Sequence, residues 1–149
     1  MRLHGLTILL VEDDADNLEL IGSFLEDEGA RTLCAGSIAS ALALSAGERV
    51  DVVVSDLELA DGDGCGLLAA LRSRDGGDVP AIAVTGYSTQ TWRTKAANCG
   101  FVRYALKPFS LETLAGWICE LTRDCGSSDA PSASYPQEPR PAAASRSPR

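Results

Sequence analysis

The sequence predicts an α/β fold in which helices cover both faces of one open parallel sheet. Short apolar runs alternate five times with helix-length amphipathic segments, which is the pattern of repeated strand–helix units. The runs are apolar at successive positions, as expected for strands that are buried on both faces. The chain has 149 residues, of which 45% are hydrophobic and 23% charged, and this composition is typical of one folded globular domain.

Five segments are predicted as strands because each is brief and mostly apolar. These are residues 6–11, 30–34, 50–55, 81–84 and 101–106. Right-handed crossovers between successive strands imply a doubly wound sheet, and the flavodoxin-like strand order 2-1-3-4-5 is expected for five such units. In such sheets ligands bind at the carboxyl ends of the strands, where the first and third strands lie side by side.

The intervening segments have helical periodicity. The first helix is predicted over residues 16–28, where Leu18, Ile21 and Leu25 lie on one face and Gly29 follows as a stop signal. The others are predicted over residues 37–46, 65–73 and 89–99, and from Ser110 onward.

Two details support the later helices. Ser37 and Ser110 precede their helices as N-caps. Trp117 belongs to the apolar stripe of the last helix, so we expect it to pack in the core rather than to bind a ligand.

The composition changes near residue 125. Of the last 24 residues, 16 are Pro, Ser or Ala, and no apolar periodicity remains. Such a segment buries too little apolar surface to offset the entropy lost on ordering. We therefore expect a folded domain over residues 3–124 and a disordered tail over residues 125–149, which is too short and too rich in Pro to form an output domain.

Charge and cysteine content exclude several classes of protein. Residues 1–125 carry 19 acidic and 10 basic side chains, and such a surface disfavours direct binding of nucleic acid. No apolar run approaches the ~20 residues of a membrane span, and no signal peptide begins the sequence, so a cytoplasmic location is expected. Five cysteines without a C-x-x-C spacing favour unpaired, partly buried thiols over a disulfide framework or a zinc site.

Chemically active side chains follow the predicted strands at their carboxyl ends. Glu12 and Asp13 follow the first strand and Asp56 follows the third, so three carboxylates are expected in one crevice. Their mutual repulsion calls for a cation, and an all-oxygen ligand set suits Mg²⁺ or Mn²⁺. Thr85 and Lys107 follow the last two strands. A hydroxyl and an ammonium beside a metal and a carboxylate predict a phosphoryl site with Asp56 as nucleophile.

Each of these groups alone has an ordinary structural explanation. Acidic residues after a strand often cap a helix, and we expect Asp14 or Asp16 to do so instead of binding metal. A threonine after a strand is usually structural, and a Lys-Pro pair usually forms a turn. Their convergence at one predicted crevice favours the functional interpretation.

The motifs at these positions resemble the receiver domain of bacterial two-component response regulators, including the single-domain chemotaxis regulators. The resemblance covers about residues 5–123. The matching segments are Ile8-Leu9-Leu10-Val11-Glu12-Asp13-Asp14, Val53-Val54-Ser55-Asp56, Asp63-Gly64, Val84-Thr85-Gly86 and Tyr104-Ala105-Leu106-Lys107-Pro108-Phe109.

The resemblance implies a role for each site residue. Asp56 would be the phosphoacceptor, and Glu12 and Asp13 would bind the metal together with Asp56 and the backbone carbonyl of Glu58. Thr85 and Lys107 would contact the phosphoryl group, and the Lys107–Pro108 peptide bond would be cis.

The resemblance also implies a conformational switch. Tyr104 would be the switch aromatic, with its ring turning inward as Thr85 moves toward the phosphoryl group. The face formed by the fourth helix, the last strand and the fifth helix would then change its partner binding, with Trp92, Arg93, Lys95 and Arg103 as candidate contacts. One departure from the family is Ala60 in place of its usual proline, which predicts a looser loop over residues 57–64.

The implied function is signal transduction by phosphorelay. A sensor histidine kinase or a histidine phosphotransferase would supply the phosphoryl group, a downstream effector protein would bind the changed surface, and phosphorylation could promote a homodimer. The protein would not be an enzyme, apart from slow self-dephosphorylation. Two alternatives remain: a phosphatase with an aspartyl nucleophile, loosely suggested by Asp56-Leu57-Glu58, and an interaction module that needs no phosphorylation.

Overall fold

The computed structural model describes residues 2–86 and 89–122, and these form a three-layered α/β fold. The parallel sheet consists of β1 (Thr7–Val11), β2 (Arg31–Ala35), β3 (Val52–Asp56), β6 (Ala81–Thr85) and β7 (Arg103–Leu106). Its strand order is β2-β1-β3-β6-β7, which confirms the predicted order 2-1-3-4-5. The predicted tail over residues 125–149 lies outside the described residues.

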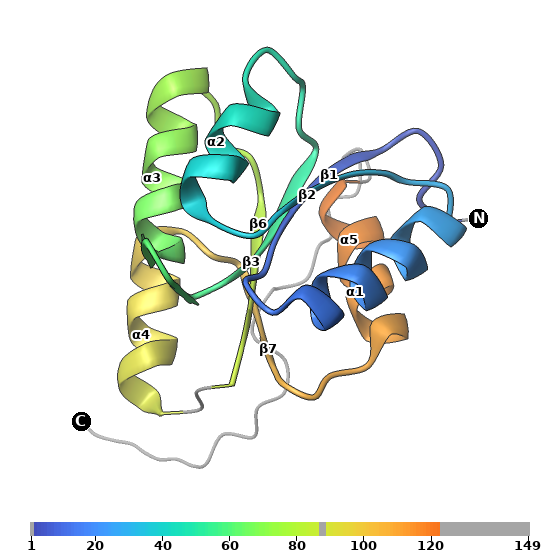
Figure 1. Cartoon of the computed structure of the whole chain (residues 1–149). Coiled ribbons are helices and arrows are strands. Elements are labelled where there is room, and N and C mark those ends of the chain that lie inside the picture. Colours follow the sequence, from blue (N-terminus) through green and yellow to red (C-terminus); the bar gives the residue numbers. More distant parts are fainter. Residues whose placement is uncertain (1, 87–88, 123–149) are drawn as a thin grey trace.

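The five helices are α1 (Ala15–Asp27), α2 (Ile38–Ser45), α3 (Gly64–Asp75), α4 (Gln90–Cys99) and α5 (Leu111–Thr122). Figure 1 shows α1 and α5 on one side of the sheet and α2, α3 and α4 on the other. In the described part of the chain, no helix has the length and apolar character needed to cross a membrane.

Side-chain caps fix where the helices begin. Asp14 caps α1 by accepting hydrogen bonds from the backbone N–H groups of Asp16 (2.9 Å) and Asn17 (3.2 Å). Of the two residues predicted as possible caps, Asp14 and Asp16, the structure thus has Asp14 in this role. Ser37 caps α2 as predicted. The Ser110 hydroxyl likewise accepts a hydrogen bond from the N–H of Thr113 at 3.1 Å, at the start of α5.

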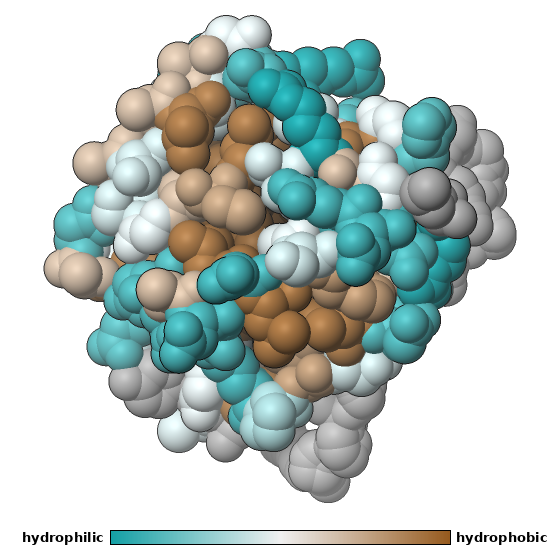
Figure 2. Space-filling model, turned by 45° about the vertical axis from the view of Figure 1, so that its right-hand side comes forward, coloured by the Kyte–Doolittle hydropathy of each residue, from teal (hydrophilic) through white to brown (hydrophobic). Residues whose placement is uncertain are grey.

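Each helical layer has its own core cluster against the sheet. One cluster joins the sheet to α2, α3 and α4, and the other joins it to α1 and α5. Trp117 is partly buried and packs against the second cluster, as its place in the apolar stripe of α5 predicts. Figure 2 shows that apolar residues on this face gather in two groups, with hydrophilic residues between and around them.

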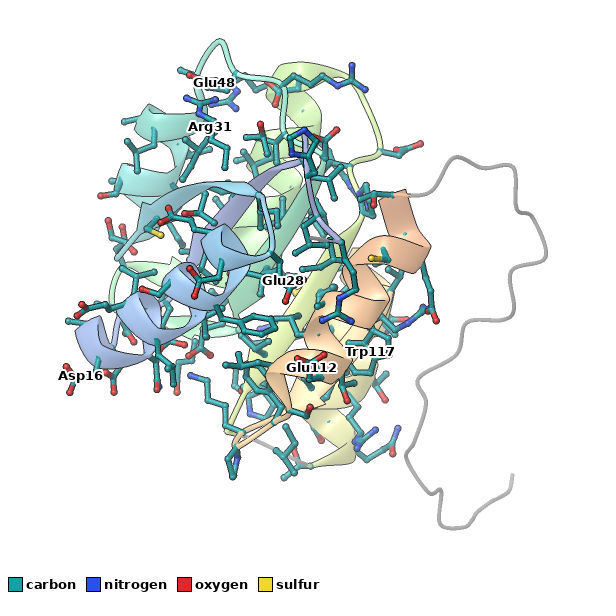
Figure 3. The ribbon with its side chains drawn as sticks, turned by 90° about the vertical axis from the view of Figure 1, so that its right-hand side faces the viewer. Asp16, Glu28, Arg31, Glu48, Glu112 and Trp117 are labelled. Carbon is teal, nitrogen blue, oxygen red and sulfur yellow. A yellow bond between two sulfur atoms is a disulfide. The ribbon has the colours of Figure 1, made fainter. Side chains whose placement is uncertain are left out.

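The N-terminus is held to the α1–α5 layer by charge. Arg2 forms ion pairs with Glu28, directly after α1, and with Glu112 on α5. Both glutamates, together with Trp117, are labelled in Figure 3. The pairing fixes residues that precede the first strand.

The short antiparallel ladder of β4 (Glu58–Leu59) and β5 (Gly62–Asp63) was not predicted. Each strand has only two residues, too few to show the alternation that identifies a strand in a sequence. The ladder lies in the loop between β3 and α3, directly after Asp56.

The expectation that all cysteines are unpaired was wrong for two of them. Cys65 and Cys99 form a disulfide, with their Cα atoms 5.6 Å apart. The two cysteines are 34 residues apart in the sequence and meet only because the first turn of α3 approaches the end of α4, so no local spacing indicated the pair. Cys34 and Cys119 are free and Cys119 is partly buried, as expected, but Cys34 is exposed. Cys125 lies outside the described residues.

Candidate functional site

The predicted acidic group assembles at the carboxyl edge of the sheet. Glu12 directly follows β1, and Asp56 ends the neighbouring strand β3. One carboxylate oxygen from each of Glu12, Asp13 and Asp56 lies within 4.8 Å of the others. Glu12 and Asp56 are buried, whereas Asp13 is exposed at the mouth of the group.

Lys107 reaches this group from the end of β7. Its Nζ donates to Oε1 of Glu12 at 2.7 Å and to Oδ2 of Asp56 at 2.9 Å. Burial by itself lowers the pKa of Lys107, but the hydrogen bonds to Glu12 and Asp56 and their negative charges outweigh burial and raise this pKa above its ordinary 10.5. The lysine is therefore charged at neutral pH.

The backbone of Lys107 is fixed on both sides. Its N–H donates to the carbonyl of Thr85 at 2.8 Å, and the Lys107–Pro108 bond is cis, as the resemblance implied. Thr85 ends β6 and is fully buried. The structure thus brings Thr85, Lys107 and Asp56 to one edge of the sheet.

The loop after Asp56 is held in place despite the alanine at position 60. The Asp61 carboxylate accepts hydrogen bonds from the N–H groups of Ile38 (3.0 Å) and Ala39 (3.1 Å) at the start of α2. These hydrogen bonds, that from Ile38 first and that from Ala39 second, lower the pKa of the Asp61 carboxyl below its ordinary value. With the β4–β5 ladder, these contacts restrain the loop that we expected to be loose.

Gly64 allows this loop to close against the acceptor strand. Its N–H donates to the carbonyl of Leu57 at 2.9 Å, and a Cβ atom at position 64 would lie 2.6 Å from the backbone oxygen of Asp56. Any larger residue must therefore displace the backbone of the candidate acceptor. The N–H of Glu58 also donates to Oδ1 of Asp56 at 3.2 Å, which orients that carboxylate.

The aromatic ring of Tyr104 is already buried in this structure, with only 5% of the residue exposed. In the β6–β7 register Tyr104 is paired with Ala83, two residues before Thr85, so Tyr104 and Thr85 lie on the same face of the sheet. The Arg93 guanidinium of α4 lies 5.0 Å from the centre of the ring. The ring thus occupies the inward position that the switch hypothesis assigned to the phosphorylated protein.

Two of the four candidate contacts for a partner are less available than expected. Arg103 is only 7% exposed, because its side chain pairs with Glu120 of α5. Lys95 points toward α3, where it forms a 2.9 Å ion pair with Asp63. Side-chain direction on a short polar helix could not be obtained from the sequence, so the Asp63–Lys95 pair was missed.

The donor set fits a hard divalent cation. The three carboxylates carry an excess of negative charge, because Lys107 is paired with Glu12 and Asp56 alone. Oxygen is the ligand that Mg²⁺ and Mn²⁺ prefer. A negatively charged phosphoryl group can approach these carboxylates only if a cation balances their charge. The arrangement therefore suits transfer of a phosphoryl group to a carboxylate oxygen.

Comparison with known proteins agrees with this chemistry. Residues 8–118 match the family described as the response regulator receiver domain. The chain belongs to this family. Receiver domains accept phosphoryl groups as regulators and bind Mg²⁺ in an acidic pocket, and response regulators interact with histidine kinases and effectors.

Individual relatives and structures show the same likeness. The chain is 38% identical over 107 residues to an uncharacterised 14.6 kDa protein of Leptolyngbya boryana, covering 71% of this chain and 82% of that protein. It is 33% identical to the probable transcriptional regulatory protein TcrX of Mycobacterium tuberculosis, covering 80% of this chain but only 51% of that regulator. The crystal structure of a CheY-like receiver domain protein from Methanospirillum hungatei has a TM-score of 0.71 and 29% identity, covering 77% of this chain and 91% of that one.

Proposed function

We propose that this receiver domain acts in the cytoplasm and takes a phosphoryl group on Asp56 from a sensor histidine kinase or a histidine phosphotransferase. The observation that carries the proposal is the position of the Asp56 carboxylate, which is grouped with Glu12 and Asp13 and bonded to Lys107 at 2.9 Å. A phosphatase is disfavoured, because Asp56-Leu57-Glu58 begins at the last residue of the third strand of a receiver fold.

In the proposed reaction a carboxylate oxygen of Asp56 attacks the phosphorus of a phosphohistidine. The P–O bond forms as the P–N bond breaks, and the histidine nitrogen leaves with the electron pair. Glu12, Asp13, Asp56 and the backbone carbonyl of Glu58 would hold Mg²⁺ or Mn²⁺, which neutralises charge on the carboxylates and the phosphoryl oxygens. Lys107 and the hydroxyl of Thr85 would bind the remaining oxygens, with Lys107 exchanging its carboxylate contacts for the phosphoryl group.

The first experiment measures intact mass after incubation with acetyl phosphate and Mg²⁺. We expect one added phosphoryl group on the wild type and none on Asp56→Asn or after chelation of the metal. Asp61→Asn is the matched control, because it makes the same change in the same loop at a residue that caps α2, so it should still be labelled. Equal labelling of Asp56→Asn would contradict the proposal.

The response to phosphorylation is proposed to pass through Thr85 and Tyr104 to the face formed by α4, β7 and α5. Movement of the Thr85 hydroxyl toward the phosphoryl group favours the buried ring that the structure contains. Release of that ring in the unphosphorylated protein would disturb the stacking of Arg93 and so change α4. The changed face would bind an effector or a second copy of the chain.

Side-chain NMR of Tyr104 tests this step. Beryllofluoride, a phosphoryl mimic, should shift the ring signals of the wild type, and Thr85→Ala should suppress the shift while Asp56 remains open to labelling. Ring signals that do not move in the wild type would contradict the switch.

A further inference from the structure

The disulfide between Cys65 and Cys99 joins the first turn of α3, directly after the loop that follows Asp56, to the end of helix α4. We propose that this pair is a redox-controlled tie: the disulfide restrains α4, and its reduction to two thiols releases the helix to respond to phosphorylation. The second part of this inference rests on the proposed function, namely the phosphorylation of Asp56, and the tie itself does not depend on that phosphorylation.

The tie acts at the junction between two helices of the same layer. Cys65 lies in the first turn of α3 and Cys99 is the last residue of α4, which Figure 1 shows on the same side of the sheet. An ion pair between Asp63 and Lys95 spans the same junction. Asp63 is the N-cap of α3, so both links hold α4 to the beginning of α3.

The beginning of α3 is held by backbone contacts against the segment that contains Asp56 and Leu57. Gly64 donates a backbone hydrogen bond to Leu57, the residue after Asp56, and has no room for a side chain against the Asp56 carbonyl. Cys65 is the next residue. A covalent bond at this position therefore connects α4 to a segment that cannot shift without moving the acceptor backbone.

Helix α4 is also the element that contacts the candidate switch residue. Arg93 stacks on Tyr104, and Trp92 packs against the core cluster that contains this ring. Because Cys99 ends the same helix, the disulfide limits how far α4 can move when the ring environment changes. Helix α4 is therefore expected to be less mobile when the disulfide is formed and more mobile when it is reduced to two thiols.

The pair is accessible to a redox partner. Cys65 and Cys99 line a surface groove together with Gln90, Thr94 and Lys95, and neither cysteine is fully buried. In a reducing compartment a disulfide is typically transient or redox-sensing instead of permanent, and the proposed cytoplasmic location puts this pair in that category.

The chemistry is thiol–disulfide exchange with a small disulfide such as oxidised glutathione. A protein thiolate attacks one glutathione sulfur and expels the other glutathione as a thiol, forming a mixed disulfide. The second protein cysteine then attacks the protein sulfur and expels the second glutathione. Two protein thiols are oxidised to one disulfide, and one glutathione disulfide is reduced to two thiols that carry the two protons.

The pair can be measured separately from every other cysteine. Trypsin cleavage after Arg49, Arg72, Lys95 and Arg103 gives fragments 50–72 and 96–103, which contain Cys65 and Cys99 as their only cysteines. The full chain is equilibrated at several ratios of reduced to oxidised glutathione, alkylated and digested without reduction. We expect the two fragments to be linked under oxidising conditions and separately alkylated under reducing conditions.

Hydrogen exchange then reports the effect on α4. Reduction should increase amide exchange in residues 90–99 about tenfold while exchange in β1 changes little, since local opening depends on local constraints. Cys65→Ser and Cys99→Ser should each reproduce the reduced state under both conditions. Cys119→Ser, which removes a free cysteine on α5, should behave as the wild type.

The final arm adds beryllofluoride with Mg²⁺. The exchange of α4 should respond more strongly in the reduced protein than in the oxidised one. Three results would overturn the proposal: fragments that stay unlinked at every glutathione ratio, α4 exchange that does not depend on the redox state, or a beryllofluoride response that is present and of equal size in both states. A missing response in both states, with redox-dependent exchange intact, would instead contradict the proposed phosphorylation switch and leave the tie standing.

Discussion

Replacing Lys107 with methionine tests how the acidic cluster is stabilised. Lys107 contacts Glu12 at 2.7 Å and Asp56 at 2.9 Å, and at an effective dielectric constant of about 20 each contact corresponds to roughly 6 kcal/mol of gross attraction. Loss of solvation offsets most of this attraction. Breaking a fully buried ion pair costs about 3–5 kcal/mol, whereas breaking an exposed one costs about 0–1 kcal/mol.

The exposure of the three side chains decides between these limits. Glu12 is 1% exposed and Asp56 11%, while Lys107 is 23% exposed, so the site is closer to the buried case. We therefore expect Lys107→Met to lower the free energy of unfolding by about 2 kcal/mol at neutral pH in metal-free buffer. Added Mg²⁺ should restore part of the loss, because the cation replaces the missing positive charge.

The assay is urea unfolding monitored by circular dichroism, with Lys95→Met as the matched control. Lys95 also forms a 2.9 Å ion pair, but its side chain is 48% exposed, so its removal should cost no more than about 1 kcal/mol. Equal losses for the two variants would refute the claim that burial makes the Lys107 cluster special. A loss for Lys107→Met that Mg²⁺ leaves unchanged would refute the claim that the cluster binds this cation.

Three further predictions concern stability. Gly64→Ala should destabilise the protein by about 1–3 kcal/mol in urea unfolding and slow labelling by acetyl phosphate, because the new methyl group meets the Asp56 backbone oxygen; an unchanged labelling rate would contradict this. Reducing the Cys65–Cys99 disulfide should lower the free energy of unfolding by about 4 kcal/mol, the loop-closure value for a 34-residue separation, and thermal unfolding with and without reductant measures it. Because the pKa of Lys107 is raised, its stabilising contribution is complete below pH 10.5 and is lost as the pH rises through the folded pKa. In this alkaline range the free energy of unfolding should therefore fall less for Lys107→Met than for the wild type.

The strand order and the acidic site could be predicted because both depend on patterns that are local in the sequence. Mostly apolar runs identified the five strands, and topology rules then placed Glu12 beside Asp56. The expected burial on both faces does not hold for β2, an edge strand in which Arg31 and Cys34 are exposed. Side chains at the carboxyl ends of parallel strands all lie at the same edge of the sheet. The predicted ends of the helices differed from the structure by a residue or two.

What the sequence could not provide depends on side-chain direction and on contacts between distant elements. Burial of Arg103 depends on its pairing with Glu120, and burial of the Tyr104 ring on the cover that α4 provides. The Cys65–Cys99 bond depends on the approach of two helix ends. The β4–β5 ladder is too short to produce a pattern. The looser loop was expected from Ala60 alone, because the contacts that Asp61 makes with α2 depend on the fold.

The central claim is that Asp56 itself becomes an acyl phosphate, and the most direct measurement locates that bond. Borohydride reduces an aspartyl phosphate to homoserine, so the protein is treated with acetyl phosphate and Mg²⁺, reduced, digested with trypsin and sequenced by tandem mass spectrometry. Fragment 50–72 contains Asp51, Asp56, Asp61 and Asp63, which makes the other three internal controls. The account predicts homoserine at position 56 alone, whereas homoserine at another position, or phosphorylated protein with none at position 56, would contradict it.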